Sequence, residues 1–486
     1  MRIAIIGMGT AGVTVLKELS KSRRFQDMQI DAYDNPINMG QGVPFQNDSD
    51  QLLINLPAEQ MSLNLDNKRE FFDWYQAQSK FKFSNPEYLP RFVFGHYMKA
   101  FVDKINNANA NVTLIKEEVA EVFIESNIGK TDVLYHVCTS NDMEHCKTYD
   151  IVFLTVGTLS YHDPYQLKGK PGYIHTPYPT YHTLDNVKDT DNIAIIGTGL
   201  ASLDVIRYVT EHHINLPITV ASRKGELPSV RGEMPEITFQ YLTPEKFNEL
   251  KAENFGNVPL DDAMALFLKE CAVYEIPVET LVHRKVGNPV EDLKYDLEHA
   301  KDLGKFQSIL ELIKENLNWI WNSFNRNDQK RFLEQYQPIL KANSNPMPPR
   351  TAKLLIEHIE NEQIRIYDGL ENIEYNNHQF KLTYANHGDD YFDIVINATG
   401  SKTQLKDLDS DDQLVINLEN RQVIQAHPLG GIQIVAETNQ VISPRYGTLQ
   451  NMFALGQLTN GINQSRNGVT MIVRQATGII HRLLEN

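Results

Sequence analysis

An α/β fold built around two parallel sheets is predicted by two glycine loops that occur in the same sequence context. The first loop, at residues 7–12, follows a short apolar strand predicted at residues 2–6 and leads into an amphipathic helix. The second, at residues 197–202, follows an apolar strand predicted at residues 193–196 and also leads into a helix. Because strand, glycine loop and helix in this order begin a Rossmann-type unit, the sequence predicts two Rossmann-type dinucleotide-binding domains.

The elements around the first loop predict a discontinuous domain made of residues 1–160 and 351–486. Strand and helix alternate in both parts, which favours a parallel sheet. The predicted helices lie at residues 13–19, 69–78, 92–106, 352–359 and 469–484. The predicted strands lie at residues 29–33, 112–115, 119–124, 133–138, 151–156, 364–367, 394–397 and 452–455.

The second domain is predicted at residues 161–242, with a helix at 203–209 and a strand at 218–221 after its glycine loop. The pattern then changes, because Phe306, Ile309 and Ile313 fall at helical spacing and form one apolar face. Residues 243–350 are therefore predicted to be a helical insertion, which we expect on the substrate side. A segment with three prolines at residues 343–350 is typical of a connector.

Composition excludes several classes of partner. Lys and Arg total 46 against 62 Asp and Glu, which gives a net charge of −16. Nucleic acid and anionic membranes both require a basic face, so neither is expected as a partner. No stretch approaches 18 apolar residues, and we expect no membrane span.

The chain has three cysteines, Cys138, Cys146 and Cys271, and none belongs to a Cys-x-x-Cys pair. A redox-active disulfide of that form is therefore not expected, and three cysteines are too few for a secreted disulfide framework. Both observations favour a reducing, cytoplasmic location. The 15 histidines show no spacing typical of a metal site, so we predict none.

The first loop has the residue types that a dinucleotide pyrophosphate requires. Gly7 allows the tight turn, Gly9 lets the backbone approach the pyrophosphate, and Gly12 lets the helix pack against the sheet. Thr10 and Ala11 complete the loop at the helix N-terminus, whose free N–H groups attract phosphate. Asp34, which lies 22 residues after Gly12, can accept hydrogen bonds from ribose hydroxyls.

The second loop differs at two positions. Ser202 replaces the third glycine after Gly197 and Gly199, and a small residue is tolerated there. The next strand ends at Ser222 and Arg223, where an acidic residue would be expected for NAD. A hydroxyl and a guanidinium can hold a 2′-phosphate, so we predict NADPH, with NADH as the alternative.

Three more predicted strands carry small residues at their ends, in Thr155-Val156-Gly157, Ala398-Thr399-Gly400 and Ala454-Leu455-Gly456. Each run ends in glycine, at Gly157, Gly400 or Gly456. Glycine at such a position permits close approach of the backbone to a ligand, although it also occurs in plain turns.

The two loops and the run Ala398-Thr399-Gly400 resemble flavoproteins with two dinucleotide-binding domains. More closely, residues 197–204 and 222–228 are similar to a bacterial FAD-NAD(P)-binding protein family, which includes flavin-dependent urate hydroxylases and aspartate N-monooxygenases. Residues 52–58, 90–97 and 454–461 match the same family. The resemblance covers both nucleotide folds and the C-terminus but not the helical insertion.

The resemblance implies positions for FAD. Gly7, Gly9, Gly12 and Asp34 would hold its AMP half, and Val119 would lie near the adenine. The Gly456 turn and the start of the last helix, around Gly468, would lie against the flavin. Many relatives have Asp after the glycine of that turn, whereas this chain has Gln457, which can supply a neutral hydrogen bond to the ribityl chain.

The resemblance also implies an activity, that of an FAD-dependent oxidoreductase reduced by NADPH. The expected reaction is monooxygenation of a small nucleophilic substrate by O2 through a flavin hydroperoxide. Two alternatives stay open: an NAD(P)H-dependent flavin reductase or dehydrogenase without oxygen insertion, and a non-catalytic dinucleotide-binding sensor. Gln41, Asn55 and Arg466 are candidates for lining the flavin or the substrate, although each is equally suited to satisfying backbone groups in a loop.

Overall fold

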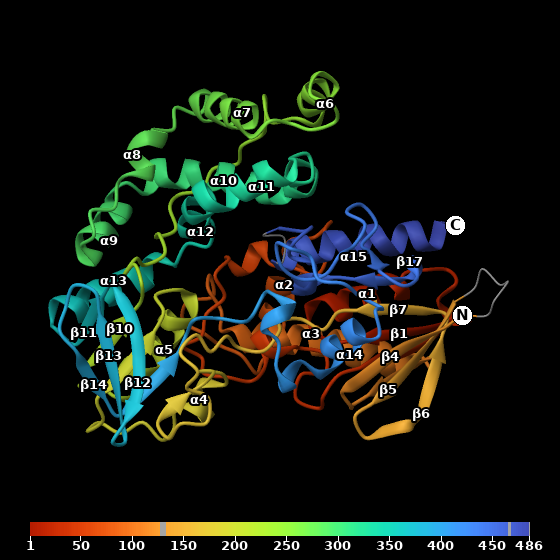
Figure 1. The fold of residues 1–486 in the computed structure, drawn as a ribbon, viewed down its shortest axis with the longest axis horizontal. Coiled ribbons are helices and arrows are strands. Elements are labelled where there is room, and N and C mark those ends of the chain that lie inside the picture. Colours follow the sequence, from red (N-terminus) through yellow and green to blue (C-terminus); the bar gives the residue numbers. More distant parts are fainter. Residues whose placement is uncertain (127–132, 465–467, 486) are drawn as a thin grey trace. The chain divides into compact units, whose positions relative to one another are not determined.

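The computed structural model describes residues 1–126, 133–464 and 468–485, which form two compact units (Figure 1). The first unit comprises Met1–Ser160 and Ser401–Asn486, and the second comprises Tyr161–Gly400. The chain therefore leaves the first unit and returns to it once.

The first unit is organised around a six-stranded sheet. Its order is β16-β17-β7-β1-β2-β3, and all neighbours are parallel except β16 and β17. This is the arrangement expected when apolar strands alternate with helices along the chain. The strands are β1 (Arg2–Ile6), β2 (Gln29–Tyr33), β3 (Val112–Ile115), β7 (Ile151–Leu154), β16 (Gln440–Ser443) and β17 (Gly447–Ala454).

Different layers cover the two faces of this sheet because side chains alternate along each strand. Ile3 and Ile5 pack with the helices α1 (Thr10–Ser20), α3 (Arg91–Ala108) and α15 (Val469–Glu485). Ala4 and Ile6 face an antiparallel meander on the other side. The meander consists of β4 (Val119–Ser126), β5 (Val133–Thr139) and β6 (Asp142–Tyr149), and the helix α14 (Gln413–Asn420) packs beside it.

The second unit repeats this three-layer plan. Its parallel sheet has the order β11-β10-β9-β15-β8. One face packs on α5 (Leu200–His212) and α13 (Pro349–Glu360), and the other packs on a second antiparallel meander. The strands are β8 (Tyr173–Ile174), β9 (Ile193–Ile196), β10 (Ile218–Ala221), β11 (Ile364–Tyr367), β12 (Leu370–Asn376), β13 (Gln379–Tyr384), β14 (Asp390–Phe392) and β15 (Ile394–Asn397).

The predicted helical insertion lies between β10 and α13 and has a core of its own, which includes Phe306 and Ile309. The fully buried carboxylate of Glu270 accepts backbone N–H bonds from Gln240, Tyr241 and Leu242 and so fixes the entry loop. The helices of the insertion are α6 (Pro244–Glu253), α7 (Leu260–Val273), α8 (Val278–Val282), α9 (Pro289–Glu298), α10 (Ala300–Trp321), α11 (Arg326–Gln335) and α12 (Gln337–Ser344). Two short helices elsewhere are α2 (Glu70–Gln76) and α4 (Thr180–Thr183).

The structure corrects the expected domain boundary. Residues 351–400 were assigned above to the first domain, but they lie in the second unit. The reason is strand pairing, because β11 pairs with β10 and β15 pairs with β9 along their full lengths. Among the described helices, none is long and apolar enough to cross a membrane.

The structure also pairs two of the cysteines. Cys138 on β5 and Cys146 on β6 form a disulfide with Cα atoms 4.4 Å apart, and Cys271 is buried and free. Their eight-residue separation carries no signal in the sequence, because the pairing depends on the register of the hairpin. Neither cysteine belongs to a Cys-x-x-Cys pair, and the cytoplasmic location stays a prediction.

We expect alkylation of the unfolded, unreduced protein to label Cys271 alone, and alkylation after reduction to label all three cysteines. Mass spectrometry counts the labels, and Cys271→Ala serves as the control, with one label fewer in each condition. A bridge over so short a loop stabilises the fold by about 2–3 kcal/mol in the chain-entropy model, so Cys146→Ala should lower the free energy of unfolding by that amount. Three labels without reductant would show that the bridge does not form.

Candidate functional site

The first glycine loop lies at the carboxyl edge of the first sheet, between β1 and α1. Gly7 has φ +98°, and an ideal Cβ there would lie 2.3 Å from the carbonyl oxygen of Thr155. A Cβ at Gly12 would lie 2.0 Å from the carbonyl oxygen of Gly7. Both positions therefore require glycine. The loop turns tightly and directs the N-terminus of α1 toward the sheet edge, where ligands of parallel sheets bind.

The residues between these two glycines leave backbone N–H groups available. Gly9 is the N-cap of α1, and no side chain caps the first turn, which contains Thr10 and Ala11. Free N–H groups and the positive end of the helix dipole together favour an anion such as a pyrophosphate. The structure thus gives the predicted phosphate loop the required geometry.

A second loop, which contains the candidate residue Gln41, lies against Gly9. Gly42 has φ +68°, and an ideal Cβ there would lie 2.8 Å from the Cα of Gly9. The surrounding segment packs on α3, where Gly95 closely contacts the backbone of Phe45. The signal in the sequence is Gly40-Gln41-Gly42, whose two glycines both have positive φ. The two loops therefore touch at Gly9 and Gly42 through backbone atoms, and we call this pair of contacting glycines the cradle.

Asp34 follows β2 and lies beside the first loop. Its Oδ2 accepts a hydrogen bond from the Met8 N–H at 2.7 Å, and its Oδ1 accepts one from the Asn35 N–H at 2.8 Å. Burial raises the pKa of this carboxyl to about 6, although the two N–H bonds act in the opposite direction. The carboxylate is therefore held, largely buried, beside the first glycine loop. The side chain of Asn35 donates to Glu118, so the start of β4, with the buried Val119, lies beside Asp34.

Two further strand ends lie at the same sheet edge. Gly157 follows β7 and Gly456 follows β17, and both strands run parallel to β1. Both glycines have positive φ, and an ideal Cβ at either would meet no atom within 4 Å. Space is therefore open beside both turns, as close approach of a ligand requires.

The turn after Gly456 contains a buried acceptor without a donor. Asn463 is fully buried, and its Nδ2 donates to the Thr459 Oγ1 at 3.1 Å. No described residue donates to its Oδ1. Gln457 in the same turn accepts from the side chain of Asn460 at 2.8 Å. Because a buried acceptor normally has a donor, the Asn463 Oδ1 is suited to a donor on a bound ligand.

The second glycine loop has the same geometry in the second unit. An ideal Cβ on Gly197 would lie 2.7 Å from the carbonyl oxygen of Ala398, at the end of β15. Gly199 is the N-cap of α5, again without a capping side chain, and a Cβ there would meet nothing within 4 Å. Ser202 is fully buried against the sheet, and Gly400 has open space around it. Gly400 therefore belongs with the second loop and not with Gly157 and Gly456.

The end of β10 carries no carboxylate. The Ser222 Oγ accepts the Gly225 N–H at 2.9 Å and lies 3.3 Å from the Thr198 Oγ1. Arg223 is exposed, and none of the residues that the structure describes forms an ion pair with it. Ser222 therefore shapes the turn, and the Arg223 guanidinium is available to an anionic group.

The remaining candidates are spread around the first unit. Gln41 is buried in the Gly40–Gly42 turn, where its side chain donates to the Ile37 carbonyl at 2.6 Å. Asn55 is half-buried, and Gly468 is exposed just before α15. Arg466 lies outside the described residues. The described chain contains no cluster of His, Cys, Asp and Glu suited to a metal ion.

Comparison with protein families gives one match. Residues 4–159 match the model of the FAD-NAD(P)-binding family, which covers the first glycine loop, Asp34 and Gly157. A comparison with curated protein sequences found no match.

Several solved structures share the fold along the whole chain. The reduced ornithine hydroxylase from Pseudomonas aeruginosa has a TM-score of 0.61 at 13% identity, covering 100% of this chain and 98% of that one. L-lysine 6-monooxygenase from Pseudomonas syringae has a TM-score of 0.60 at 13% identity, with the same coverage. A bacillithiol disulfide reductase from Staphylococcus aureus has a TM-score of 0.53 at 11% identity, again with 100% and 98% coverage.

These similarities agree with the architecture described above. Both units have the strand order of a nucleotide-binding sheet, and both place a glycine loop at its carboxyl edge. The chain has the fold of flavoproteins with two dinucleotide-binding domains, and its residues 4–159 form a FAD-NAD(P)-binding domain.

Proposed function

We propose that this chain is an FAD-dependent oxidoreductase that NADPH reduces and that hydroxylates a small nucleophilic substrate with O2. The observation that carries the proposal is the difference between two otherwise matching loops. The first has a carboxylate at the end of its second strand, and the other has Ser222 and the exposed Arg223. A carboxylate suits an unphosphorylated ribose, and an arginine suits a 2′-phosphate.

The residues of the first unit fit FAD. In the cradle, the backbones of Gly9 and Gly42 touch without intervening side chains, which suits the close approach of a pyrophosphate to the backbone. Asp34 would accept hydrogen bonds from the ribose of the AMP half. Gly157 and Gly456 leave open space in which a flavin ring would fit. The Asn463 Oδ1 has no donor among the described residues, and a flavin N–H would supply one.

The residues of the second unit fit NADPH. Gly197 and Gly199 present the N-terminus of α5 to a pyrophosphate, and Arg223 would pair with the 2′-phosphate. FAD, when bound, would accept a hydride from the nicotinamide and supply electrons to O2. The protein's own task is to hold both nucleotides and to exclude water from the reacting groups.

The substrate class is proposed from the solved structures that share the fold. Their titles describe an ornithine hydroxylase, an L-lysine 6-monooxygenase and a cadaverine monooxygenase. Each acts on a small molecule with a primary amine, whose nitrogen is the kind of nucleophile that the proposed reaction needs. We therefore propose a small amine as the substrate of this chain.

Anaerobic mixing of the FAD-loaded protein with NADPH, and separately with NADH, tests the proposal. We expect NADPH to bleach the visible flavin absorbance at lower concentration than NADH. Arg223→Gln should raise the NADPH concentration needed by roughly tenfold, because it removes a charge-assisted contact, and should leave NADH unaffected. Arg365→Gln, a change of an exposed arginine elsewhere in the same unit, is the matched control.

Admitting oxygen to the reduced protein separates the remaining functions. A hydroxylamine product from one of a panel of small primary amines supports the monooxygenase. Hydrogen peroxide as the only product with every amine favours a flavin reductase without oxygen insertion. Nucleotide binding without reduction, with and without amines, favours a non-catalytic sensor, and failure to bind either nucleotide contradicts the proposal.

The cradle generates a prediction for Gly42. Gly42→Ala places a Cβ 2.8 Å from the Cα of Gly9 and should weaken FAD binding at least tenfold. Gly447→Ala is the matched control, because Gly447 has φ +71°, lies in the same unit and has no atom within 4 Å of an ideal Cβ. Both changes carry a similar backbone strain of roughly 1–2 kcal/mol. Equal FAD dissociation constants for the two variants, measured by flavin fluorescence, would contradict the cradle.

Asp34 generates a prediction about pH. Its pKa is raised to about 6 in the FAD-free protein, and ribose hydroxyls donate to the charged form. FAD binding must then release a proton below pH 6, so the dissociation constant should rise by up to tenfold per pH unit below about 6 and stay level above it. Asp34→Asn should bind more weakly above pH 6 and lose this dependence. The same slope in Asp34→Asn would assign the proton to another group.

A further inference from the structure

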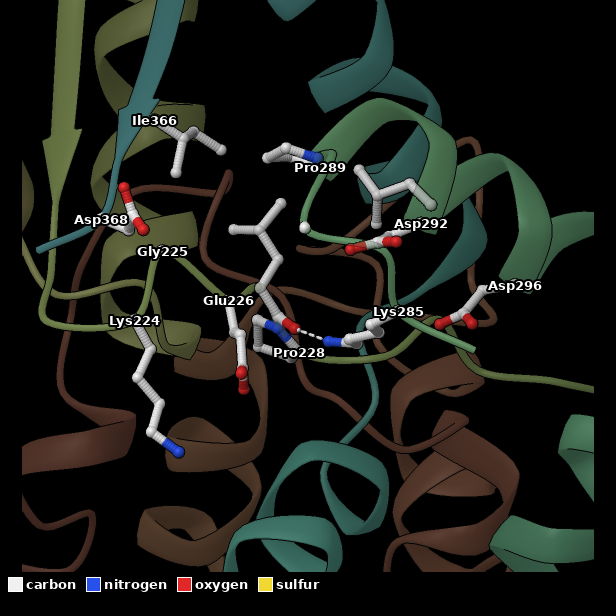
Figure 2. Close-up of a pocket in the computed structure, with 13 residues that line it drawn as sticks. Lys224, Gly225, Glu226, Pro228, Lys285, Pro289, Asp292, Asp296, Ile366 and Asp368 are labelled. Atoms are coloured by element: carbon white, nitrogen blue, oxygen red, sulfur yellow. Dashed lines mark hydrogen bonds between the residues drawn. The ribbon is translucent and has the colours of Figure 1, made fainter. Parts of the chain in front are cut away.

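A pocket of about 180 Å³ lies at the carboxyl ends of β10 and β11 in the second unit (Figure 2). One wall is the segment 224–228, which continues from Ser222 and Arg223. Lys285 and Asp292 of the helical insertion lie on the opposite side, and Ile366 and Asp368 complete the lining near the end of β11. The insertion and the nucleotide-binding sheet therefore share this pocket.

The pocket has a lining of mixed apolar and charged side chains and has room for one ring system. Typical small-molecule sites measure about 300–1,000 Å³, so this pocket suits part of a dinucleotide and not the whole. The apolar lining residues come from both walls: Leu227, Pro228, Pro289, Leu293 and Ile366. Such side chains favour the faces of a flat heterocycle.

The charge of the lining disfavours a phosphate. Glu226, Asp292 and Asp368 contribute three carboxylates against the ammonium groups of Lys224 and Lys285. A fourth carboxylate, that of Asp296, is paired with the buried guanidinium of Arg284 at 2.5 Å. An anion inside would meet net repulsion, so the pocket suits an uncharged group that has its own donors and acceptors.

Two lining side chains keep hydrogen-bonding capacity. The Lys285 Nζ donates to the Leu227 carbonyl, and its other two N–H bonds have no acceptor among the described residues. The Asp292 Oδ1 accepts the Val286 N–H at 2.8 Å, and no residue in the described part of the chain donates to its Oδ2. One donor group, the Lys285 ammonium, and one acceptor, the Asp292 carboxylate, thus line the pocket together with apolar side chains (Figure 2).

This pocket is also held firmly in place. The Asp296 Oδ2 accepts the Val230 N–H at 2.9 Å, which joins α9 to the segment after β10. Arg284 donates to the Asn343 Oδ1 at 2.9 Å, which joins the same cluster to α12. The relative positions of the two walls are therefore set by buried, charge-assisted hydrogen bonds.

We propose that this pocket binds the adenine ring of the nicotinamide nucleotide. Asp292 accepts a hydrogen bond from the exocyclic amine, Lys285 donates to the neighbouring N7, which is an acceptor in adenine and in hypoxanthine alike, and the apolar side chains contact the ring faces. The exposed Arg223 takes the 2′-phosphate outside the pocket, so the charged and uncharged parts of the nucleotide are separated. The assignment rests on the proposed function, because it concerns the nucleotide proposed for the second glycine loop.

Binding of NADP⁺ and of its hypoxanthine analogue to the full chain tests this assignment without turnover. Hypoxanthine has a carbonyl where adenine has the amine, and Asp292 should repel it. We expect the wild-type protein to prefer NADP⁺ about tenfold or more in calorimetric titrations. Asp292→Asn should lose most of this preference, because the amide can donate to the carbonyl. If Asp292 has only a structural role, Asp292→Asn should weaken the binding of both nucleotides equally.

Two further variants complete the design. Lys285→Met should weaken the binding of NADP⁺ about tenfold. The binding of nicotinamide mononucleotide, which lacks adenosine, should stay unchanged. Val286→Ala changes a side chain on the same loop that is 70% exposed and does not line the pocket, so it should bind as the wild type does. Thermal unfolding confirms that each variant is folded.

The outcomes separate the two proposals. If the wild type binds NADP⁺ and the preference survives in Asp292→Asn, the adenine assignment is wrong and the proposed function stands. If the wild type binds neither NADP⁺ nor NAD⁺, the proposed function fails and the assignment fails with it. Equal weakening of nicotinamide mononucleotide in Lys285→Met would also overturn the assignment, because it would show a general loss of structure.

Discussion

The close contact between a glycine and the neighbouring strand determines where both sites can form. A side chain at Gly7 would collide with the Thr155 carbonyl, and one at Gly197 would collide with the Ala398 carbonyl. Only glycine lets the loop turn while β1 lies beside β7 and β9 lies beside β15. The helix that follows then starts at the sheet edge with its N–H groups free. The phosphate loops, the open strand ends and the position of Asp34 all depend on this turn.

The two units share one arrangement of strand, glycine loop and helix but differ in the residue that follows the second strand. In each, the residue after the second strand contacts the glycine loop: Asp34 accepts the Met8 N–H at 2.7 Å, and Ser222 lies 3.3 Å from the Thr198 hydroxyl. A carboxylate at this position repels an added phosphate, whereas a hydroxyl beside an exposed arginine accommodates it. A single position of the fold therefore distinguishes the proposed nucleotides, and the sequence was sufficient to predict that difference.

The sequence predicted the strands and loops that a short run of residues identifies. It missed the features that form only when segments distant in the chain pack together. Strands β1 and β9 are short apolar runs before glycine, and their recognition needs no tertiary information. Strand β6 begins with four exposed residues, of which only Met143 is apolar, so it has no regular alternation to detect. The contact of Gly42 with Gly9 and the bridge between Cys138 and Cys146 both join segments through tertiary folding. The assignment of residues 351–400 failed for the same reason, because strand pairing, and not sequence order, sets the boundary.

The place of the insertion in the chain explains how it can take part in nucleotide binding. It replaces the connection between β10 and α13, so it begins at the carboxyl end of β10, where ligands of parallel sheets bind. An insertion at the opposite end of that strand would lie at the wrong edge. The segment after Arg223 consequently forms one wall of the pocket, and α9, fixed to Val230 through Asp296, forms the other. The insertion is therefore in a position to contact a nucleotide that extends past the end of β10.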